Sequence, residues 1–204
     1  MLLFQIKWEN RLINDDGSPC KVSVDGTDFR TVEWKPFNSA RKSHKFNGPG
    51  LRYEVIIAIK TGFIVSLNGP FLCGSHPDLR IARQWLHNVL PPGEFHVADG
   101  GHRDKHSPSV VQSMVPPNEI RAFKLIRARH ETVNGRFKEW KILGHCCGHH
   151  ESCHSSVFHA IATITQIEMA DGSRPAFLIG NLWLNLPKLV QQIVKLNSCC
   201  VASN

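Results

Sequence analysis

The chain has 204 residues, of which 42% are hydrophobic and 20% are charged. One domain of this length buries roughly 70% of its extended surface, so the composition supports a packed core and excludes global disorder. Its 24 Lys and Arg against 17 Asp and Glu give a net charge of +7, which suits a polyanionic partner such as nucleic acid and equally a mildly basic enzyme.

The cysteines and the apolar runs bear on the compartment. Seven cysteines, an odd number that includes two adjacent pairs, do not form the regular framework of a secreted disulfide protein. The N-terminal MLLF is shorter than the apolar region of a signal peptide. The longest apolar run, 176–186, is shorter than the ~20 residues that span a bilayer. We therefore expect a soluble protein in a reducing, intracellular compartment, with no membrane partner.

The first quarter of the chain predicts strands and loops. After a polar, turn-rich lead-in over residues 1–20, alternating residues predict a strand at about 21–25. The dipeptide Asp25-Gly26 is typical of a turn, and a second short strand is predicted at 29–34. Residues 35–50 combine Pro, Gly and basic residues, and predict an exposed basic loop.

A hairpin and a helix are predicted next. Two β-branched runs, 51–60 and 63–69, are separated by Thr61-Gly62, which predicts a hairpin with a two-residue turn. Residues 79–90 change to helical spacing and end at Pro91-Pro92. The segment EFHVADGG, 94–101, predicts a strand that runs into a Gly-rich turn.

Two helices are predicted in the last third. Asn118, after two prolines, is a plausible N-cap for a long helix whose apolar stripe runs from Ile120 to Trp140. A loop, 145–154, separates it from a helix that we expect to begin near Ser155. Strands followed by a strand–helix crossover predict an α/β fold with a mixed sheet flanked by helices. We divide the chain into a lead-in (1–20), one domain (21–172) and an apolar tail of unknown role (173–204).

Three acids stand at positions that favour chemistry. Asp25 is predicted at the end of the first strand, Asp99 at the end of the strand before the Gly-rich turn, and Glu131 in the middle of the long helix. Aspartates at the ends of neighbouring strands can converge, and a helix beside them can add a third carboxylate. Clustered carboxylates repel one another, and divalent cations relieve that repulsion. Each aspartate alone also fits a turn dipeptide, and Asp28 is expected to be polar surface.

The helix face that carries Glu131 is polar. It presents Arg127, Glu131, Asn134, Gly135 and Lys138, whereas the apolar stripe points elsewhere. Gly135 would let a backbone or a metal approach the acid closely. The alternative is an exposed Glu131 in an i,i+4 ion pair with Arg127, which is a common arrangement on helix surfaces.

Five segments in chain order resemble a known family. They are SVDGTDF, SHKFNGPGLRYEV, NGPFLCGSHPDLRI, VADGG and ARHETVNGRFKEWKIL. Each alone is a weak signal, but together they resemble the catalytic domain of DDE superfamily endonucleases, namely the Harbinger-type and related insertion-sequence-type transposases. The resemblance covers about residues 9–170. The chain departs from the family at His102, where the family usually carries an aromatic residue.

The resemblance implies a fold, an activity and a set of site residues. The fold is ribonuclease-H-like, and three acids bind two divalent ions, Mg²⁺ or Mn²⁺, that carry DNA cleavage and strand transfer. Matched motif by motif, the acids fall on Asp25, Asp99 and Glu131, and Asp78 falls on a position where a supporting role is plausible. Candidate phosphate contacts, each of which is equally compatible with a solvated surface role, are Lys42, Lys45, Arg127, Arg136 and Lys138.

The expected partner is DNA, in the nucleus. Such transposases carry a DNA-binding domain ahead of the first aspartate, and the 24 residues before Asp25 are too few for one. We therefore expect a separate DNA-binding protein or domain, and oligomerisation is compatible with this arrangement. The same observation supports a second hypothesis, a relic or domesticated module that binds DNA without cutting it.

Two further alternatives remain open. The segment HCCGHHESCH, 145–154, offers sulfur and imidazole ligands for Zn²⁺, although its spacing fits no usual zinc finger. The chain can also be an unrelated basic enzyme in which the three acids are turn and surface residues.

Overall fold

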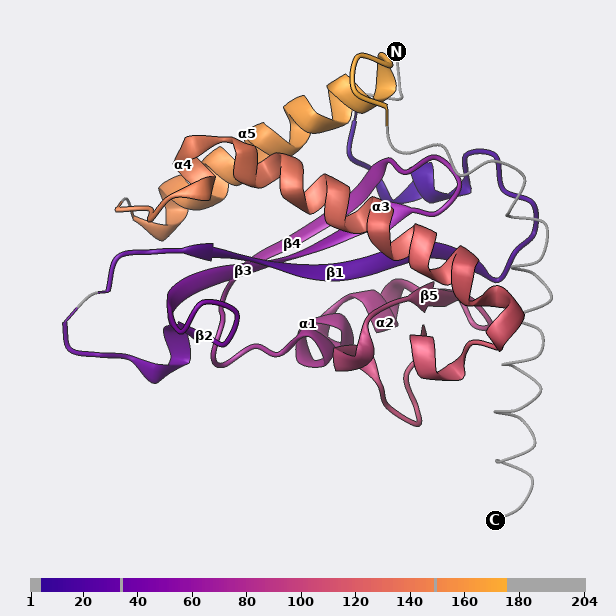
Figure 1. The fold of residues 1–204 in the computed structure, drawn as a ribbon, viewed down its shortest axis with the longest axis horizontal. Helices are drawn as coiled ribbons and strands as arrows, with labels where there is room; N and C mark the ends of the chain where they lie inside the picture. Colours follow the sequence, from indigo (N-terminus) through magenta and orange to yellow (C-terminus); the bar gives the residue numbers. More distant parts are fainter. Residues whose placement is uncertain (1–4, 34, 149, 176–204) are drawn as a thin grey trace.

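The computed structural model describes residues 5–33, 35–148 and 150–175. A mixed sheet lies at its centre, with three helices on one face and two short helices on the other (Figure 1). The predicted class, an α/β fold with a mixed sheet flanked by helices, is thereby confirmed. Most of the expected apolar tail, 176–204, lies outside the described residues.

The sheet has an antiparallel half and a parallel half. In the first, β1 (Cys20–Arg30) pairs with β3 (Gly48–Ala58), and β3 pairs with β4 (Ile64–Leu72). In the second, β5 (Phe95–Val97) lies parallel to β1, and β6 (Ser109–Val110) lies parallel to β5. The strand order is therefore β4-β3-β1-β5-β6, with β3 running opposite to β1, β5 and β6. The two-residue β2 (Lys42–Ser43) pairs with the start of β3.

Helices cover both faces of this sheet (Figure 1). On one face lie α1 (Asp78–Gln84) and α2 (Leu86–Val89). On the other lie α3 (Ile120–Glu139), α4 (Lys141–Gly144) and α5 (Glu151–Ala170). The two 20-residue helices α3 and α5 are thus the main cover of the sheet.

Alternation along β3 divides the core between these layers. Tyr53 and Val55 point to the α3–α5 side, where they share a buried cluster with Phe158. Ile56 and Ala58 point to the α1–α2 side. Successive side chains of a strand face opposite sides of a sheet, so a strand covered on both faces is apolar throughout. This explains the continuous apolar run VIIAI, residues 55–59.

The most consequential difference from the prediction is that β1 is one long strand. Asp25 pairs with Val55 and Gly26 pairs with Glu54, in the middle of the β1–β3 ladder. An Asp-Gly dipeptide favours a turn where the chain reverses, but the ladder continues on both sides of this one and keeps it extended. The predicted strand end at Asp25 and the separate strand at 29–34 are therefore wrong.

Three predicted boundaries also change. The β3–β4 connection runs from Ile59 to Phe63 with Gly62 at a φ of 77°, so it is longer than a two-residue turn. The predicted helix at 79–90 is interrupted at Trp85, whose φ and ψ of −133° and −62° are not helical. Asn118 lies within a 3₁₀ turn, Pro117–Glu119, and does not cap α3.

The last helix begins earlier than predicted. α5 starts at Glu151, and the His150 Nδ1 accepts a hydrogen bond from the Ser152 N–H at 3.3 Å. This cap satisfies one of the amide groups that a helix N-terminus leaves unpaired. Part of the predicted Cys/His loop is consequently helical.

Asp28 is buried, contrary to its expected place on the surface. Arg52 Nε and Nη2 donate to its two oxygens at 2.7 and 3.0 Å, and the Asp28 side chain is 1% exposed. Ser43 Oγ donates to the same carboxylate at 2.5 Å. Asp28, Arg52 and Ser43 come from β1, β3 and β2. Their hydrogen bonds therefore join these three strands on the α1–α2 face of the sheet.

We expect Arg52→Met to cost about 3–5 kcal/mol in the free energy of unfolding, because it leaves the Asp28 charge buried without its partner. Urea denaturation of the variant and the wild type measures this. The matched control is Arg83→Met, which removes an exposed ion pair with Asp104 and should cost less than about 1 kcal/mol. Equal losses in the two variants would show that the buried pair has no special weight.

Candidate active site

The sheet register brings Asp25 and Asp99 to the same level. Ser23 of β1 is paired with Val97 of β5 in a parallel ladder. Two residues farther along β1 stands Asp25. Two residues beyond Val97, past the end of β5, stands Asp99, which begins the 3₁₀ turn Gly100–His102. The two acids that the sequence separates are therefore neighbours at this end of the β1–β5 pair.

The polar face of α3 lies against Asp25. Arg127 Nη1 donates to the Val24 carbonyl at 3.0 Å, and Arg127 Nη2 lies 3.4 Å from Asp25 Oδ1. Asn134 Nδ2 donates to the other oxygen of Asp25 at 3.2 Å. The Asp25 side chain is 13% exposed, so these two α3 residues cover most of it.

Asp99 is held by the turn that follows it. Its Oδ1 accepts a hydrogen bond from the Gly101 N–H at 2.9 Å and lies 3.1 Å from His102 Nδ1. The hydrogen bond from His102 is the main cause that lowers the pKa of Asp99 to about 2, and the nearby Arg127 charge adds to it. Asp99 is therefore a stable anion at neutral pH, and its side chain is 43% exposed.

Glu131 faces the same open cavity as Asp99. A cavity of about 310 Å³ is lined by Asp99, Arg127 and Glu131, together with Gly100, Gln112, Phe123, Lys124 and Ala128. Glu131 is exposed, and in the described part of the chain the ion pair of Arg127 is with Asp25, so the Arg127–Glu131 alternative is not the observed arrangement. A Cβ on Gly135 would meet open space, so no backbone approaches the acid there.

Asp78 lies on the α1 side of β1. A Cβ on Gly26 would stand 2.2 Å from Asp78 Oδ1, so a larger residue there would displace this carboxylate from its present position. Arg52 Nη1 lies 3.1 Å from the same oxygen. Burial raises the pKa of Asp78, and the positive charge of Arg52 opposes that rise. The negative charge of Asp99 also contributes to the raised pKa of Asp78, so the two acids are near one another, with Asp78 on the opposite face of β1 from Arg127.

The donors suit a hard divalent cation by their chemistry. Mg²⁺ and Mn²⁺ prefer carboxylate oxygens, which Asp25, Asp99 and Glu131 supply here. Over residues 5–33, 35–148 and 150–175, no three His, Cys, Asp or Glu side chains are gathered closely enough to hold an ion. The Arg127 guanidinium lies among the acids and offsets their repulsion. Ion binding would require Asp25, Asp99 and Glu131 to close around the ion.

The candidate phosphate contacts separate into two groups. Lys45 Nζ donates to the Gly26 carbonyl at 2.5 Å, next to Asp25. Burial lowers the pKa of Lys138, with the charge of Lys45 adding to the effect and Asp28 and Asp25 opposing it. Lys45 and Lys138 therefore converge beside the acids, and Lys42 is exposed on β2.

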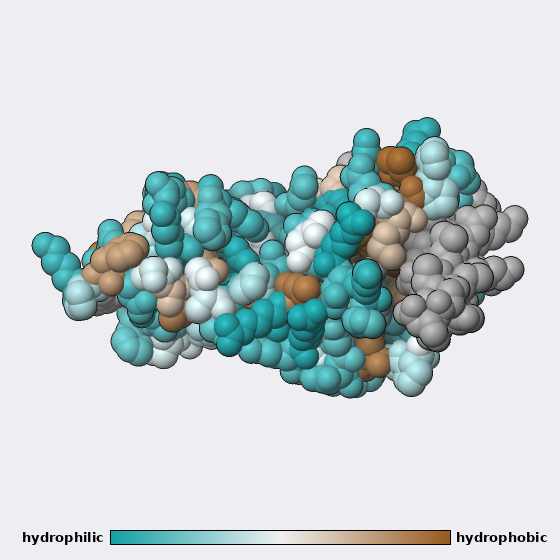
Figure 2. Space-filling view, turned by 90° about the horizontal axis from the view of Figure 1, so that it is seen from below, coloured by the Kyte–Doolittle hydropathy of each residue, from teal (hydrophilic) through white to brown (hydrophobic). Residues whose placement is uncertain are grey.

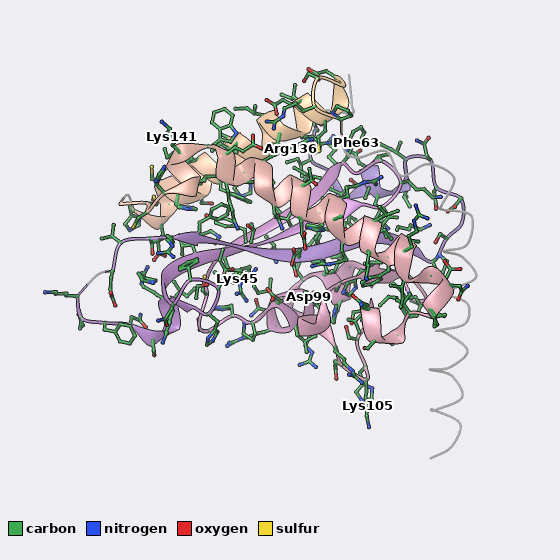
Figure 3. All side chains as sticks on the ribbon, viewed as in Figure 1. Lys45, Phe63, Asp99, Lys105, Arg136 and Lys141 are labelled. Atoms are coloured by element: carbon green, nitrogen blue, oxygen red, sulfur yellow. The ribbon has the colours of Figure 1, made fainter. Side chains whose placement is uncertain are left out.

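Arg136 is placed elsewhere. Its guanidinium donates to the carbonyls of Arg174 and Pro175 at 2.7 and 3.0 Å, and the residue is 8% exposed. Figure 3 shows Arg136 near α5 above the sheet, whereas Lys45 and Asp99 lie below β1. Arg136 is thus a structural contact at the end of α5, contrary to the prediction that it binds phosphate.

Two buried histidines near the acids were missed by the sequence reasoning. His130 Nδ1 lies 2.9 Å from Ser23 Oγ, and burial lowers its pKa to about 4. His102 contacts Asp99 as described above. His130 has no local sequence signal, since its contact with Ser23 depends on which strand lies beneath α3. The position of His102 three residues after Asp99 was the one available hint.

The Cys/His segment does not form a metal centre in the described residues. Cys147 is buried and forms a β-bridge with Thr31, while Cys146 and Cys153 are exposed. No described group there can hold an ion, and His149 lies outside the described residues. The zinc alternative gains no support from these placements.

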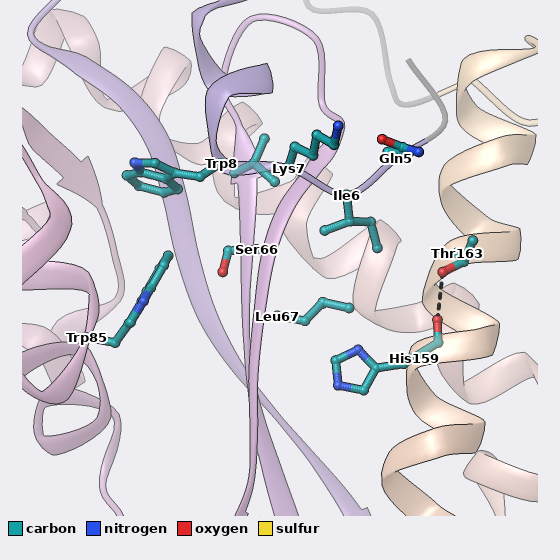
Figure 4. A pocket seen from close by; sticks show the side chains of 10 residues that line it. Gln5, Ile6, Lys7, Trp8, Ser66, Leu67, Trp85, His159 and Thr163 are labelled. Atoms are coloured by element: carbon teal, nitrogen blue, oxygen red, sulfur yellow. Dashed lines mark hydrogen bonds between the residues drawn. The ribbon is translucent and has the colours of Figure 1, made fainter. Parts of the chain in front are cut away.

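A second open cavity lies away from the acids. It has a volume of about 620 Å³ and is lined by Trp8, Trp85, His159 and residues of β4 (Figure 4). Trp8 and Trp85 meet edge to face with ring centroids 5.4 Å apart. None of Asp25, Asp99 and Glu131 lines it.

The surface on the α1–α2 side is mostly hydrophilic, with scattered apolar residues (Figure 2). No helix in the described part of the chain is both long and apolar enough to span a membrane.

Comparisons of the chain with family models, with curated proteins and with solved structures gave no match.

Glu54 supplies a pH test of this region. Burial raises its pKa to about 7. Between pH ~4.3 and pH 7 the unfolded chain has lost this proton and the folded chain keeps it, so the stability of the wild type falls as the pH rises. Glu54→Gln mimics the protonated form. We expect it to gain up to roughly 3 kcal/mol over the wild type between pH 4 and pH 8.

Urea denaturation across this pH range measures the difference. Glu33→Gln, at an exposed position, is the control and should show no such trend. A difference between Glu54→Gln and wild type that stays constant with pH would contradict the raised pKa.

Proposed function

We propose that the chain is the catalytic domain of a metal-dependent DNA endonuclease of the transposase type, with a ribonuclease-H-like fold. The observation that supports the proposal is the pairing of Ser23 with Val97, two residues before Asp25 and Asp99, together with the cavity that Asp99 shares with Glu131. The five resembling segments contribute every acid of this arrangement.

The topology supports the finer fold assignment. A ribonuclease-H-like sheet is mixed. In the order β4-β3-β1-β5-β6, β3 is the strand that runs opposite to β1, β5 and β6. The helix with the third acid follows the parallel strands and lies over β1. The acids follow the same order as the elements, because Asp25 lies on β1, Asp99 follows β5 and Glu131 lies on α3.

In the proposed reaction the ions would be held by Asp25, Asp99 and Glu131. When bound, Mg²⁺ or Mn²⁺ supplies activation of the attacking water or 3′-hydroxyl and stabilisation of the leaving oxygen. The chain itself keeps Asp99 ionised, through the hydrogen bond from His102. Lys45 and Lys138 would hold the phosphodiester beside Asp25, and Lys42 would extend that contact along the backbone. Asp78 would support the site from the opposite face of β1.

The proposal implies DNA as partner and the nucleus as compartment. It also retains a separate DNA-binding protein or domain as a further partner. Oligomerisation would be one way to bring two strand-transfer sites together.

A second candidate is the relic module that binds DNA without cutting it. The observation that favours it is the Arg127–Asp25 pair, since a positive side chain of the chain itself already lies against one of the three acids. In that case Lys45 and Lys138 would still bind phosphate, and cleavage would be absent under all metal conditions.

Nicking of supercoiled DNA with Mg²⁺ or Mn²⁺ tests the first candidate. We expect Asp25→Asn, Asp99→Asn and Glu131→Gln each to lower the nicking rate by roughly 100-fold or more, because each removes a ligand charge from the transition state. Asp104→Asn, an acid outside the cavity, is the control and should nick like the wild type. Metal-dependent nicking that persists in Asp99→Asn would refute the assignment, and DNA binding without nicking by the wild type would favour the relic.

The salt dependence of DNA binding tests the phosphate contacts. We expect Lys45→Ala and Lys138→Ala each to reduce the slope of log K against log salt by about 1, because each removes one neutralised phosphate. Arg136→Met, whose guanidinium is already bound to carbonyls, should leave the slope unchanged. Fluorescence anisotropy on a labelled duplex measures the slopes, and an equal change in all three variants would rule out this division of roles.

A further inference from the structure

His102 is held rigidly beside Asp99. The residue is 1% exposed and ends the 3₁₀ turn Gly100–His102 that follows β5. The backbone N–H of His102 donates to the Asp99 backbone carbonyl at 3.2 Å. The backbone carbonyl of His102 accepts a hydrogen bond from Ser109 Oγ of β6 at 2.8 Å. The imidazole is thus fixed by the turn before it and by a neighbouring strand of the sheet.

The hydrogen bonds to Asp99 are directed to one oxygen. Both the Gly101 N–H, at 2.9 Å, and His102 Nδ1, at 3.1 Å, lie against Oδ1. A carboxylate that is ionised only accepts, so Nδ1 carries the proton in this contact. Within the described residues no hydrogen bond is made to Oδ2, and Asp99 lines the cavity that also holds Arg127 and Glu131.

We infer that His102 is a positioning residue of the candidate metal site, which orients Asp99 so that Oδ2 is presented to a divalent cation. This inference rests on the proposed function. Carboxylates that ligate metals are themselves held by hydrogen bonds, and loss of such a partner typically weakens metal binding by about 10- to 100-fold. His102 meets Asp99 in that relation, since it touches the ligand and not the ion.

A packing role alone does not account for the residue. His102 Nε2 is buried and has no hydrogen-bond partner among the described residues. Burying a polar atom without a partner is unfavourable, and a phenyl ring of similar shape would avoid that cost. The hydrogen bond that Nδ1 donates to Asp99 therefore explains why a histidine occupies this position.

The test compares four single variants with the wild type. His102→Phe keeps the ring and removes the donor, whereas His102→Asn places an amide N–H near the position of Nδ1. His87→Phe is the matched control: His87 belongs to the same histidine cluster, with its ring 5.5 Å from that of His96, and its hydrogen bond is to Ser107. Asp99→Asn removes the proposed ligand itself. The probe is Mn²⁺ alone, titrated into each protein and followed by the electron paramagnetic resonance signal of the free ion.

We expect His102→Phe to raise the Kd for Mn²⁺ at least about 10-fold, with His102→Asn within about threefold of the wild type and His87→Phe unchanged. Circular dichroism melts without metal establish that the variants are folded. Binding by His102→Phe at the wild-type Kd, while Asp99→Asn loses the site, would overturn the inference and leave the proposed function standing. Equal binding by Asp99→Asn and the wild type would instead refute the metal site, and the role of His102 with it.

A second measurement needs no metal. Proton–nitrogen correlation spectra of the histidine rings report which nitrogen of His102 is protonated. We expect a protonated Nδ1 whose resonance moves in Asp99→Asn and stays in place in Asp104→Asn. A bare Nδ1 in the wild type would overturn the inference whatever the Mn²⁺ titrations give.

Discussion

The Arg127 guanidinium joins α3 to the middle of β1, and the candidate site depends on that contact. It bonds the Val24 carbonyl, lies against Asp25 and lines the cavity of Asp99 and Glu131. Carboxylates gathered in one region repel each other, and Arg127 counters that repulsion, because it pairs with Asp25 and helps to lower the pKa of Asp99. One side chain therefore both seats the helix and places a positive charge beside the acids, which couples the packing of α3 to the electrostatics of the site.

A second layer of charge lies below the sheet. Arg52 clamps Asp28 and reaches Asp78, so a buried cation faces the α1 side of β1 while Arg127 faces the α3 side. A buried ion pair holds its geometry well but contributes little net stability, because desolvation offsets most of the attraction. Its value here is geometric, since it fixes Asp78 against the β1 backbone beneath Asp25. The site is thus supported from both faces of one strand.

The sequence predicts the α/β class and the helical face of Arg127 and Glu131, because these follow from hydrophobic period. It does not predict that β1 continues through Asp25-Gly26, since local turn preference is overridden by pairing with β3. The contact of His102 with Asp99 spans three residues and depends on the form of the Gly-rich turn, which is the 3₁₀ turn Gly100–His102. The burial of Asp28 and the withdrawal of Arg136 to α5 depend on contacts between residues distant in the chain. The type and spacing of residues along the sequence do not indicate which distant residues will be in contact.

The close approach of Asp78 to Gly26 links two parts of the chain that no local rule connects. Any side chain at position 26 would occupy the space of Asp78 Oδ1, so the two positions form one steric unit. Divergence of this protein would then be constrained pairwise: a larger residue at Gly26 is tolerable only in a lineage that has already shortened or turned away Asp78. The DGT and HPDL segments are expected to be inherited, or lost, together.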